Sequence, residues 1–306
     1  MQLEGCVNDA YLMSALLQEG EFDPANIRML LNQRATTEAI HDRLGWLLDG
    51  AEDGQERIFY FAGRGAQIPG YGTGEVVDHL DECLVPYDFD WSRERAVVDD
   101  QLYESYSQLA IGTRYTMIFD CCHSGGLTRD GSIRARGLIP QDEIRHRILR
   151  WDATGLRFDE RLVGDAGLRR ERARKPQRFG REGNLHRLGC AAELRLSQGR
   201  FERSRKDFGH VGSFMPTILQ ACAEQELAYE YRNGAQSQGA FTWFLAQAIR
   251  QARSRRGALN WSAVIGDVRR RLASEQYAQQ PQLVCPTALV KKNVPWLKPS
   301  VTKLRQ

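Results

Sequence analysis

The sequence of 306 residues lacks any apolar run near the ~18 residues that a membrane-spanning helix needs. It has no basic-then-apolar leader at its N-terminus and no internal repeat. Its seven cysteines show no paired spacing, and the only adjacent pair, Cys121 and Cys122, cannot readily bridge itself. These absences argue against a membrane protein and against a disulfide-rich secreted domain. We therefore expect a cytoplasmic protein in a reducing setting that has no membrane partner.

Acidic residues are scarce in the middle of the chain. Residues 127–210 contain 21 Lys and Arg but only 12 Asp and Glu, whereas the whole chain has a net charge of +3. Apolar residues have no clear period there, so we expect an arginine-rich insertion over 127–212 that is partly disordered. Basic side chains could bind phosphates. Nucleic acid is nevertheless not the partner we expect, because acids are interspersed, stacking aromatics are sparse and no recognition motif is present.

Outside this insertion, short apolar segments alternate with amphipathic ones. Strands are predicted at residues 27–31, 57–62, 115–119, 213–222 and 282–285. Helices are predicted after capping residues or over a clear 3.6-residue period, and begin near Asp9, Thr36, Asp99, Gly239 and Asn260. This alternation with short connections predicts an α/β fold, in which a mostly parallel sheet has helices on both faces.

Two of the predicted strands end in polar residues. The strand at 115–119 runs into Asp120, Cys121 and Cys122, and the strand at 57–62 breaks into glycines around Arg64. Ligands of open α/β sheets bind beyond the carboxyl ends of the strands, and neighbouring strands lie about 4.8 Å apart. We therefore expect both strand ends to contribute to one cleft.

Residues 120–125, Asp-Cys-Cys-His-Ser-Gly, resemble the nucleophile motif of the caspase-like cysteine peptidases, specifically the metacaspases and their bacterial relatives. Further matching motifs follow the family order at residues 5–10, 81–88, 221–225 and 239–242. The resemblance implies a caspase-like sheet, with a large-subunit part at 1–126, a linker at 127–212, a small-subunit part at 213–290 and a tail at 291–306. The family has an apolar strand before the motif at 5–10. We therefore expect either that the start of this sequence is truncated or misassigned, or that the sheet lacks this first strand.

The resemblance implies that Cys122 is the nucleophile and that the backbone N–H groups of Cys122 and Gly65 hold the oxyanion. The alternative is that the two cysteines are only small buried hydrophobes. Where the family has its histidine, between two glycines, this sequence has Arg64. A guanidinium cannot exchange protons, although its charge could lower the pKa of the thiol. His123 matches a family position outside the dyad and His79 lies on an acidic loop, so neither is expected to replace the missing histidine as the partner of Cys122.

These residues predict a cysteine-type endopeptidase whose activity Arg64 impairs. The alternative is a catalytically inactive relative that binds peptides or proteins through the same cleft. Asp9 and Asp120 match the acids that hold Lys or Arg before the scissile bond, so the expected partner is a protein or peptide with basic residues. Asp9 could instead cap a helix, and the two roles can coexist. A serine position of the family's pocket is Ala62 here.

The thiol chemistry requires no cofactor, but the resemblance implies a possible Ca²⁺ site. Its ligands would be Asp81, Asp99, Asp100 and Asp130. Oxygen ligands suit this hard cation. The alternative is that Asp99 caps a helix and that the other acids are solvated.

Overall fold

The computed structural model describes residues 3–69, 80–106, 109–110, 112–122, 134–138, 142, 149–154, 157–160, 214–223, 226–233, 236–254, 259–286 and 288–297. Its central sheet has the strand order β1-β5-β8-β11. The strands are β1 (Glu56–Ala62), β5 (Arg114–Asp120), β8 (Thr217–Gln220) and β11 (Gln282–Val284). β5 pairs in parallel with β1 and β8, while β11 runs antiparallel to β8. The predicted mostly parallel sheet is therefore confirmed.

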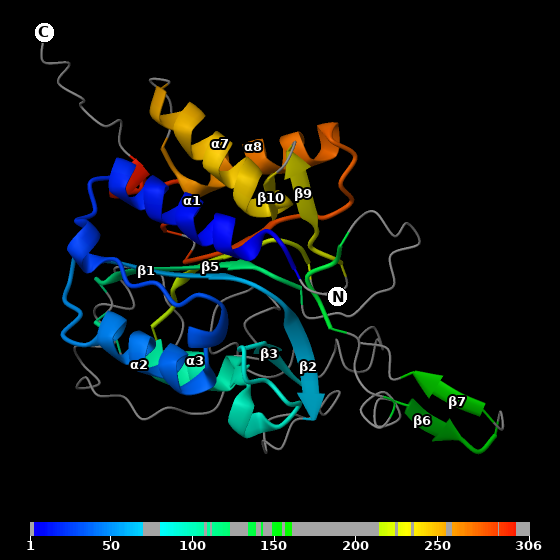
Figure 1. Cartoon of the computed structure of the whole chain (residues 1–306). Helices are drawn as coiled ribbons and strands as arrows, with labels where there is room; N and C mark the ends of the chain where they lie inside the picture. The colour runs from blue at the N-terminus through cyan, green and yellow to red at the C-terminus, as the bar shows by residue number, and fades with distance from the viewer. Residues whose placement is uncertain are drawn as a thin grey trace, which may run out of the picture.

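Helices cover both faces of this sheet (Figure 1). α1 (Cys6–Glu19), α7 (Ala240–Ser254) and α8 (Trp261–Ser274) lie on one face, and α2 (Thr37–Leu48) and α3 (Asp99–Tyr106) lie on the other. Successive side chains of β5 point to opposite faces, as a strand requires. Ile118 joins the core under α1, α7 and α8, whereas Met117 and Phe119 join the core with α2 and α3. None of the described helices is long and apolar enough to cross a membrane.

Two helices begin where their capping residues predict. The Thr36 hydroxyl accepts a hydrogen bond from the Ala39 N–H at 3.3 Å, and the Asn260 side chain accepts one from the Ala263 N–H at 2.9 Å. Asp9 behaves differently. It lies inside the first turn of α1, whose N-cap is Gly5, so the alternative that Asp9 caps this helix is wrong.

Three small antiparallel sheets surround the central one, and they were not predicted from the sequence. They are β2 (Gly65–Pro69) with β3 (Leu80–Leu84) and β4 (Val97–Val98), β9 (Glu230–Asn233) with β10 (Gln236–Gly239), and β6 (Leu149–Asp152) with β7 (Arg157–Glu160). The last pair lies within the arginine-rich insertion, where little structure was expected. The prediction of partial disorder there otherwise falls on residues outside the described ranges.

The strand predicted at residues 27–31 is not formed. Ile27 and Leu31 have extended backbones but lie between two short 3₁₀ turns, Pro24–Asn26 and Asn32–Arg34. A cavity of about 560 Å³ is lined both by this segment and by β1, the edge strand of the described sheet. The apolar side chains of this segment are only half-buried or exposed, and a strand also needs a neighbour whose backbone groups it can pair with.

Candidate active site

The two polar strand ends lie side by side, as predicted. Ala62, the last residue of β1, pairs in register with Asp120, the last residue of β5. The Gly63 N–H donates to the Asp120 carbonyl at 3.3 Å just beyond the paired strands. Because parallel neighbours end at the same edge, Arg64 and Cys122 leave the sheet on the same side.

A third segment, residues 134–138 of the arginine-rich insertion, lies between these strand ends. The N–H groups of Cys122 and Gly65 both donate to the carbonyl oxygen of Arg136, at 3.2 and 3.1 Å. The Leu138 N–H donates to the Gly65 carbonyl at 2.9 Å. The two N–H groups predicted to hold an oxyanion thus converge on one carbonyl oxygen of this chain.

The other edge of residues 134–138 pairs with the chain just before β9. The Arg136 N–H donates to the Ala228 carbonyl at 2.8 Å, and the Glu230 N–H donates to the Arg134 carbonyl at 3.0 Å. The segment is therefore held along both edges, with isolated bridges from Gly137 to Gly65 and from Ala135 to Tyr229 and a bend at Arg136 between them. This is the backbone pattern of a peptide that adds to an exposed strand.

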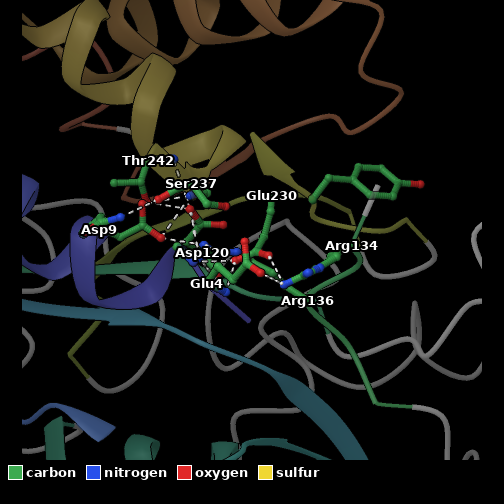
Figure 2. A network of polar contacts seen from close by, with 12 residues as sticks. Glu4, Asp9, Asp120, Arg134, Arg136, Glu230, Ser237 and Thr242 are labelled. Carbon is green, nitrogen blue, oxygen red and sulfur yellow. Dashed lines mark hydrogen bonds and ion pairs between the residues drawn. The ribbon is translucent and has the colours of Figure 1, made fainter. Parts of the chain in front are cut away.

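The side chain of Arg136 is completely buried among three carboxylates (Figure 2). Its Nη2 lies 2.5 Å from Asp9 Oδ2 and 3.8 Å from Glu230 Oε1. Its Nη1 lies 3.5 Å from Asp120 Oδ2 and donates to the Asp120 carbonyl at 3.3 Å. Asp9 and Asp120 were predicted to hold the side chain of a lysine or arginine. The structure brings both of them together around a guanidinium.

Backbone N–H donors hold all three carboxylates in place. The donors are Gly239 to Asp9 at 2.8 and 3.0 Å, Thr242 to Asp120 at 3.0 Å, and Gly5 to Glu230 at 2.7 Å. The Thr242 hydroxyl adds a second bond to Asp120 at 2.5 Å. Charge-assisted bonds of this kind are stronger than neutral ones and fix orientation. The three carboxylates are therefore held by backbone donors as well as by the guanidinium.

Burial disfavours the charged forms of both the carboxyl groups and the guanidinium in this cluster. It raises the pKa of the Asp9 carboxyl to about 6, and Asp120 adds to this effect while Arg136 works against it. Burial also depresses the pKa of the Arg136 guanidinium, but Asp120 and Asp9 outweigh that effect and hold it well above its ordinary value. The guanidinium is therefore charged at neutral pH.

The thiol of Cys122 lies deep in the cleft and is only 1 % exposed. A hydrogen bond from the Cys222 thiol lowers the pKa of Cys122, and burial opposes this effect. The backbone N–H groups of Ala228 and Arg136 lower it further, whereas the charge of Asp120 raises it. In Cys121, by contrast, burial raises the pKa of the thiol well above its ordinary value. Cys121 thus fits a buried hydrophobe, while the lowered pKa of Cys122 favours the prediction that Cys122 is the nucleophile.

Arg64 contacts the backbone on both sides of Arg136. Its Nη1 donates to the carbonyls of Ala135 at 3.2 Å and Gly137 at 2.9 Å. Of the six histidines, only His41 belongs to the described residues, and it lies on α2. His79 and His123 lie outside the described ranges, so their exclusion as partners of Cys122 stays a prediction.

The predicted Ca²⁺ ligands are only partly described. Asp81 lies in β3, Asp99 and Asp100 begin α3, and Asp130 lies outside the described ranges. The pairing of Cys83 with Val98 brings the start of α3 next to β3. Within the described residues, no three His, Cys, Asp or Glu side chains gather closely enough to hold a metal ion. The Ca²⁺ site stays a prediction.

Comparison with known proteins shows which family this chain belongs to. A family model described as caspase domain matches residues 1–294, and the chain belongs to this family. The chain is similar to Metacaspase-5 of Trypanosoma brucei brucei, with 36 % identity over 135 residues that cover 41 % of this chain and 26 % of the relative. It is also similar to Metacaspase-1 of Arabidopsis thaliana, with 33 % identity over 132 residues that cover 40 % of this chain and 35 % of the relative.

These matches span about a third or less of the length of the curated relatives. The fold is also similar to the crystal structure of protein GSU0716 from Geobacter sulfurreducens, with a TM-score of 0.58 and 19 % identity. That match covers 95 % of this chain and 89 % of the other, and it supports the fold alone.

Two residues of the cleft, Arg136 and Glu230, were not predicted from the sequence. The sequence did contain a signal for Arg136. The insertion carries a basic residue before a glycine, Arg136 before Gly137, and a pocket lined by carboxylates would accept such a basic side chain. Nothing in the sequence around Glu230 marks it as a pocket residue.

We expect Gly239→Ala to destabilise the cleft. A Cβ at this position would lie 2.7 Å from Cγ of Asp120 and 2.8 Å from Cζ of Arg136. Overpacking of this kind typically costs about 1–3 kcal/mol. Chemical denaturation should detect the loss. The matched control is Gly45→Ala at an exposed position of α2, where a Cβ meets nothing within 4 Å. There we expect the free energy of unfolding to rise by about 0.5–1 kcal/mol. Equal effects at the two glycines would contradict this explanation.

We expect the pocket to bind guanidinium groups more weakly as the pH falls from neutral toward about 6, the pKa that Asp9 has beside a guanidinium. Protonation of Asp9 removes a negative charge that faces the guanidinium, and Asp9 would have a higher pKa in an empty pocket because Arg136 lowers it. Burial raises the pKa of nearby Cys6 to about 11 and that of Tyr60 well above 10, so both stay neutral across this range.

The measurement is calorimetry of agmatine binding to an Arg136→Ala variant between pH 5 and pH 8. Affinity should rise with pH and then level off. Adding Asp9→Asn should weaken binding and remove this rise. A rise that survives Asp9→Asn would assign the titration to another group.

Proposed function

We propose that this chain binds polypeptides with an arginine or lysine directly before the bond that faces Cys122, and that it cleaves this bond as a cysteine endopeptidase. One observation carries the proposal. The Arg136 guanidinium lies between Asp9 and Asp120, while the carbonyl of the same residue accepts from the N–H groups of Cys122 and Gly65. Arg136 thus has the position that a basic residue before a scissile bond would have.

The chemistry starts with the thiolate of Cys122, which attacks the carbonyl carbon. The oxygen takes the electron pair and is held by the two N–H groups. The C–N bond then breaks, the amine takes a proton and leaves, and water hydrolyses the thioester to restore the thiol. A lowered pKa of Cys122 supports the first step. Proton delivery to the amine is the difficult step, because Arg64, at the proposed position of the family's histidine, cannot donate a proton.

A second candidate function is peptide binding without cleavage. The contacts of Arg64 favour it, since its guanidinium holds the carbonyls of Ala135 and Gly137. In this role Arg64 would improve peptide binding at the position where the family has an acid–base residue. Both candidates use the same pocket, and they differ only in whether the bound peptide is then cut.

The pocket favours arginine over lysine. The two terminal nitrogens of Arg136 contact different carboxylates, Nη2 that of Asp9 and Nη1 that of Asp120. A planar guanidinium can bridge two acceptors in this way, whereas an ammonium is a single compact charge.

We expect a purified preparation to cleave a fluorogenic arginyl peptide slowly, and Arg64→His to raise the rate at least about 10²-fold by supplying a general acid and base. Cys122→Ala should abolish cleavage. Because Arg136 itself fills the pocket, each variant is also assayed with Arg136→Ala, and all assays are run with and without Ca²⁺. If every form is inert but binds the peptide, the second candidate replaces the first. A Ca²⁺-independent rate would remove the predicted Ca²⁺ site from the mechanism.

We also expect a preference for a second basic residue two positions before the pocket arginine. Arg134 Nη1 lies 2.8 Å from Glu4 Oε1 and 4.0 Å from Glu230 Oε2. Because such exposed pairs are weak, acetyl-Arg-Ala-Arg substrates should be favoured over acetyl-Gln-Ala-Arg by about two- to fivefold. Glu4→Gln should reduce this ratio, and raising the salt concentration should reduce it too. Exposed Glu38→Gln on α2 is the control, and an unchanged ratio in Glu4→Gln would refute the assignment.

A further inference from the structure

The cavity of about 560 Å³ beside β1 is a different surface from the cleft, because none of Cys122, Arg64 and Arg136 is among the residues that line it. We infer that this cavity is a docking site for one extended, apolar segment of a separate polypeptide. This segment pairs with the open edge of β1 and carries an acidic residue at the end that faces Arg57. The inference goes beyond the proposed function and does not rest on it.

The first wall of the cavity is a strand with one open edge. Among the described strands, β1 pairs only with β5, and every residue from Gln55 to Ala62 lines the cavity. All seven residues of β1 are only half-buried, whereas six of the seven residues of β5 are buried. A parallel strand that has helices on both faces is normally buried. β1 therefore has the exposure of a strand that lacks a neighbour.

A second wall of the cavity is the segment at residues 27–31, all of which line it. Ile27 and Leu31 have extended backbones, and residues 28–30 form no backbone–backbone hydrogen bond with another described residue. An extended polypeptide supplies donors and acceptors along its whole length, so it could pair with backbone groups at these walls. An apolar small molecule would displace water from the same groups and leave them unpaired, which is costly. The backbone edges thus favour a polypeptide occupant.

The two faces of the cavity select apolar side chains. β1 lies between α1 and α2 (Figure 1), and the cavity is lined by Met13 and Leu17 of α1 and by Ile40 and Leu47 of α2. Side chains of a strand alternate between the two faces, so each residue of an added strand would meet one of these apolar walls. The occupant is therefore a continuous apolar run rather than a strand in which polar and apolar residues alternate.

The charged residues of the cavity select an acidic residue in the occupant. The described charged residues that line it are Arg28, Arg43, Arg57 and Glu56. The one acid, Glu56, already pairs with Arg114 at 3.2 Å. Nη2 of Arg57 donates to Gln55 at 2.7 Å, but its buried Nε has no hydrogen-bond partner among the described residues. An unpaired buried donor is costly, and a carboxylate is a strong acceptor for a guanidinium.

The first test uses the unmodified chain and a synthetic probe, the heptapeptide acetyl-Glu-Val-Ile-Val-Ile-Val-Glu-amide. Its length matches the seven residues of β1. Its sequence reads the same in both directions, so either strand orientation brings a glutamate near Arg57. The control peptide carries N-methyl groups on its three valines, which keep their side chains but cannot donate hydrogen bonds. Calorimetry should show at least tenfold weaker binding of the control. Equal affinity of the two peptides would assign the cavity to apolar ligands and overturn the inference.

Amide hydrogen exchange locates the bound probe. At saturation, exchange should slow at least fivefold in residues 56–62, and the N-methylated control should leave it unchanged. Binding of the probe without protection of residues 56–62 would overturn the inference. A dimer in sedimentation that protects these residues and that the probe does not dissociate would also overturn it, because a second copy of the chain would then close the edge.

The second test addresses the acidic residue. The probe should bind the unmodified chain at least threefold more tightly than an analogue with glutamine in place of both glutamates. Arg57→Gln should reduce this preference at least twofold. The control Arg95→Gln, at an exposed arginine that pairs with Asp90 and does not line the cavity, should leave it unchanged. An equal preference in Arg57→Gln and in the unmodified chain would contradict the pairing with Arg57. If Arg57→Gln does not fold, the first test decides the inference, because it needs no variant.

Discussion

The structure depends on one interaction, the pairing of a buried guanidinium with three carboxylates. Arg136 is completely buried with Asp9, Asp120 and Glu230, and these residues come from α1, β5, β9 and the arginine-rich insertion. Three carboxylates this close would repel each other if no cation were present. The cluster therefore requires a cation, and either the chain itself or a bound peptide can supply it.

The same cluster links specificity to reactivity. Asp120 is the last residue of β5 and contacts the guanidinium, and two residues later the Cys122 N–H contacts the carbonyl of the same arginine. A peptide held by its basic side chain is thus aligned with the thiol by geometry alone. Arg64 adds a second grip on the backbone. Alignment of this kind serves cleavage and stable binding equally well. The two candidate functions therefore differ only in whether a proton can be delivered to the leaving amine.

Much of this could be predicted from particular residues. The apolar run before Asp120 marked a buried strand, and Thr36 and Asn260 marked helix starts, because these signals depend on neighbours in the sequence. The motifs singled out Asp9, Asp120 and Cys122, which the structure brings into one cleft. The strand predicted at 27–31 was wrong, because an apolar pattern cannot report whether a pairing strand lies alongside.

By itself, the sequence determined the main strands and helices of the central sheet, the reactive strand end and the two acids that face a basic side chain, since each is written in a local pattern. Only the tertiary structure decided that Arg136, from a stretch expected to be a loose linker, fills that pocket, and that Glu230 helps to bind it. The physical reason is that Arg136 is 127 residues from Asp9 and 94 residues from Glu230 in the chain. Contacts over such separations depend on how the whole chain packs, and no local pattern records them.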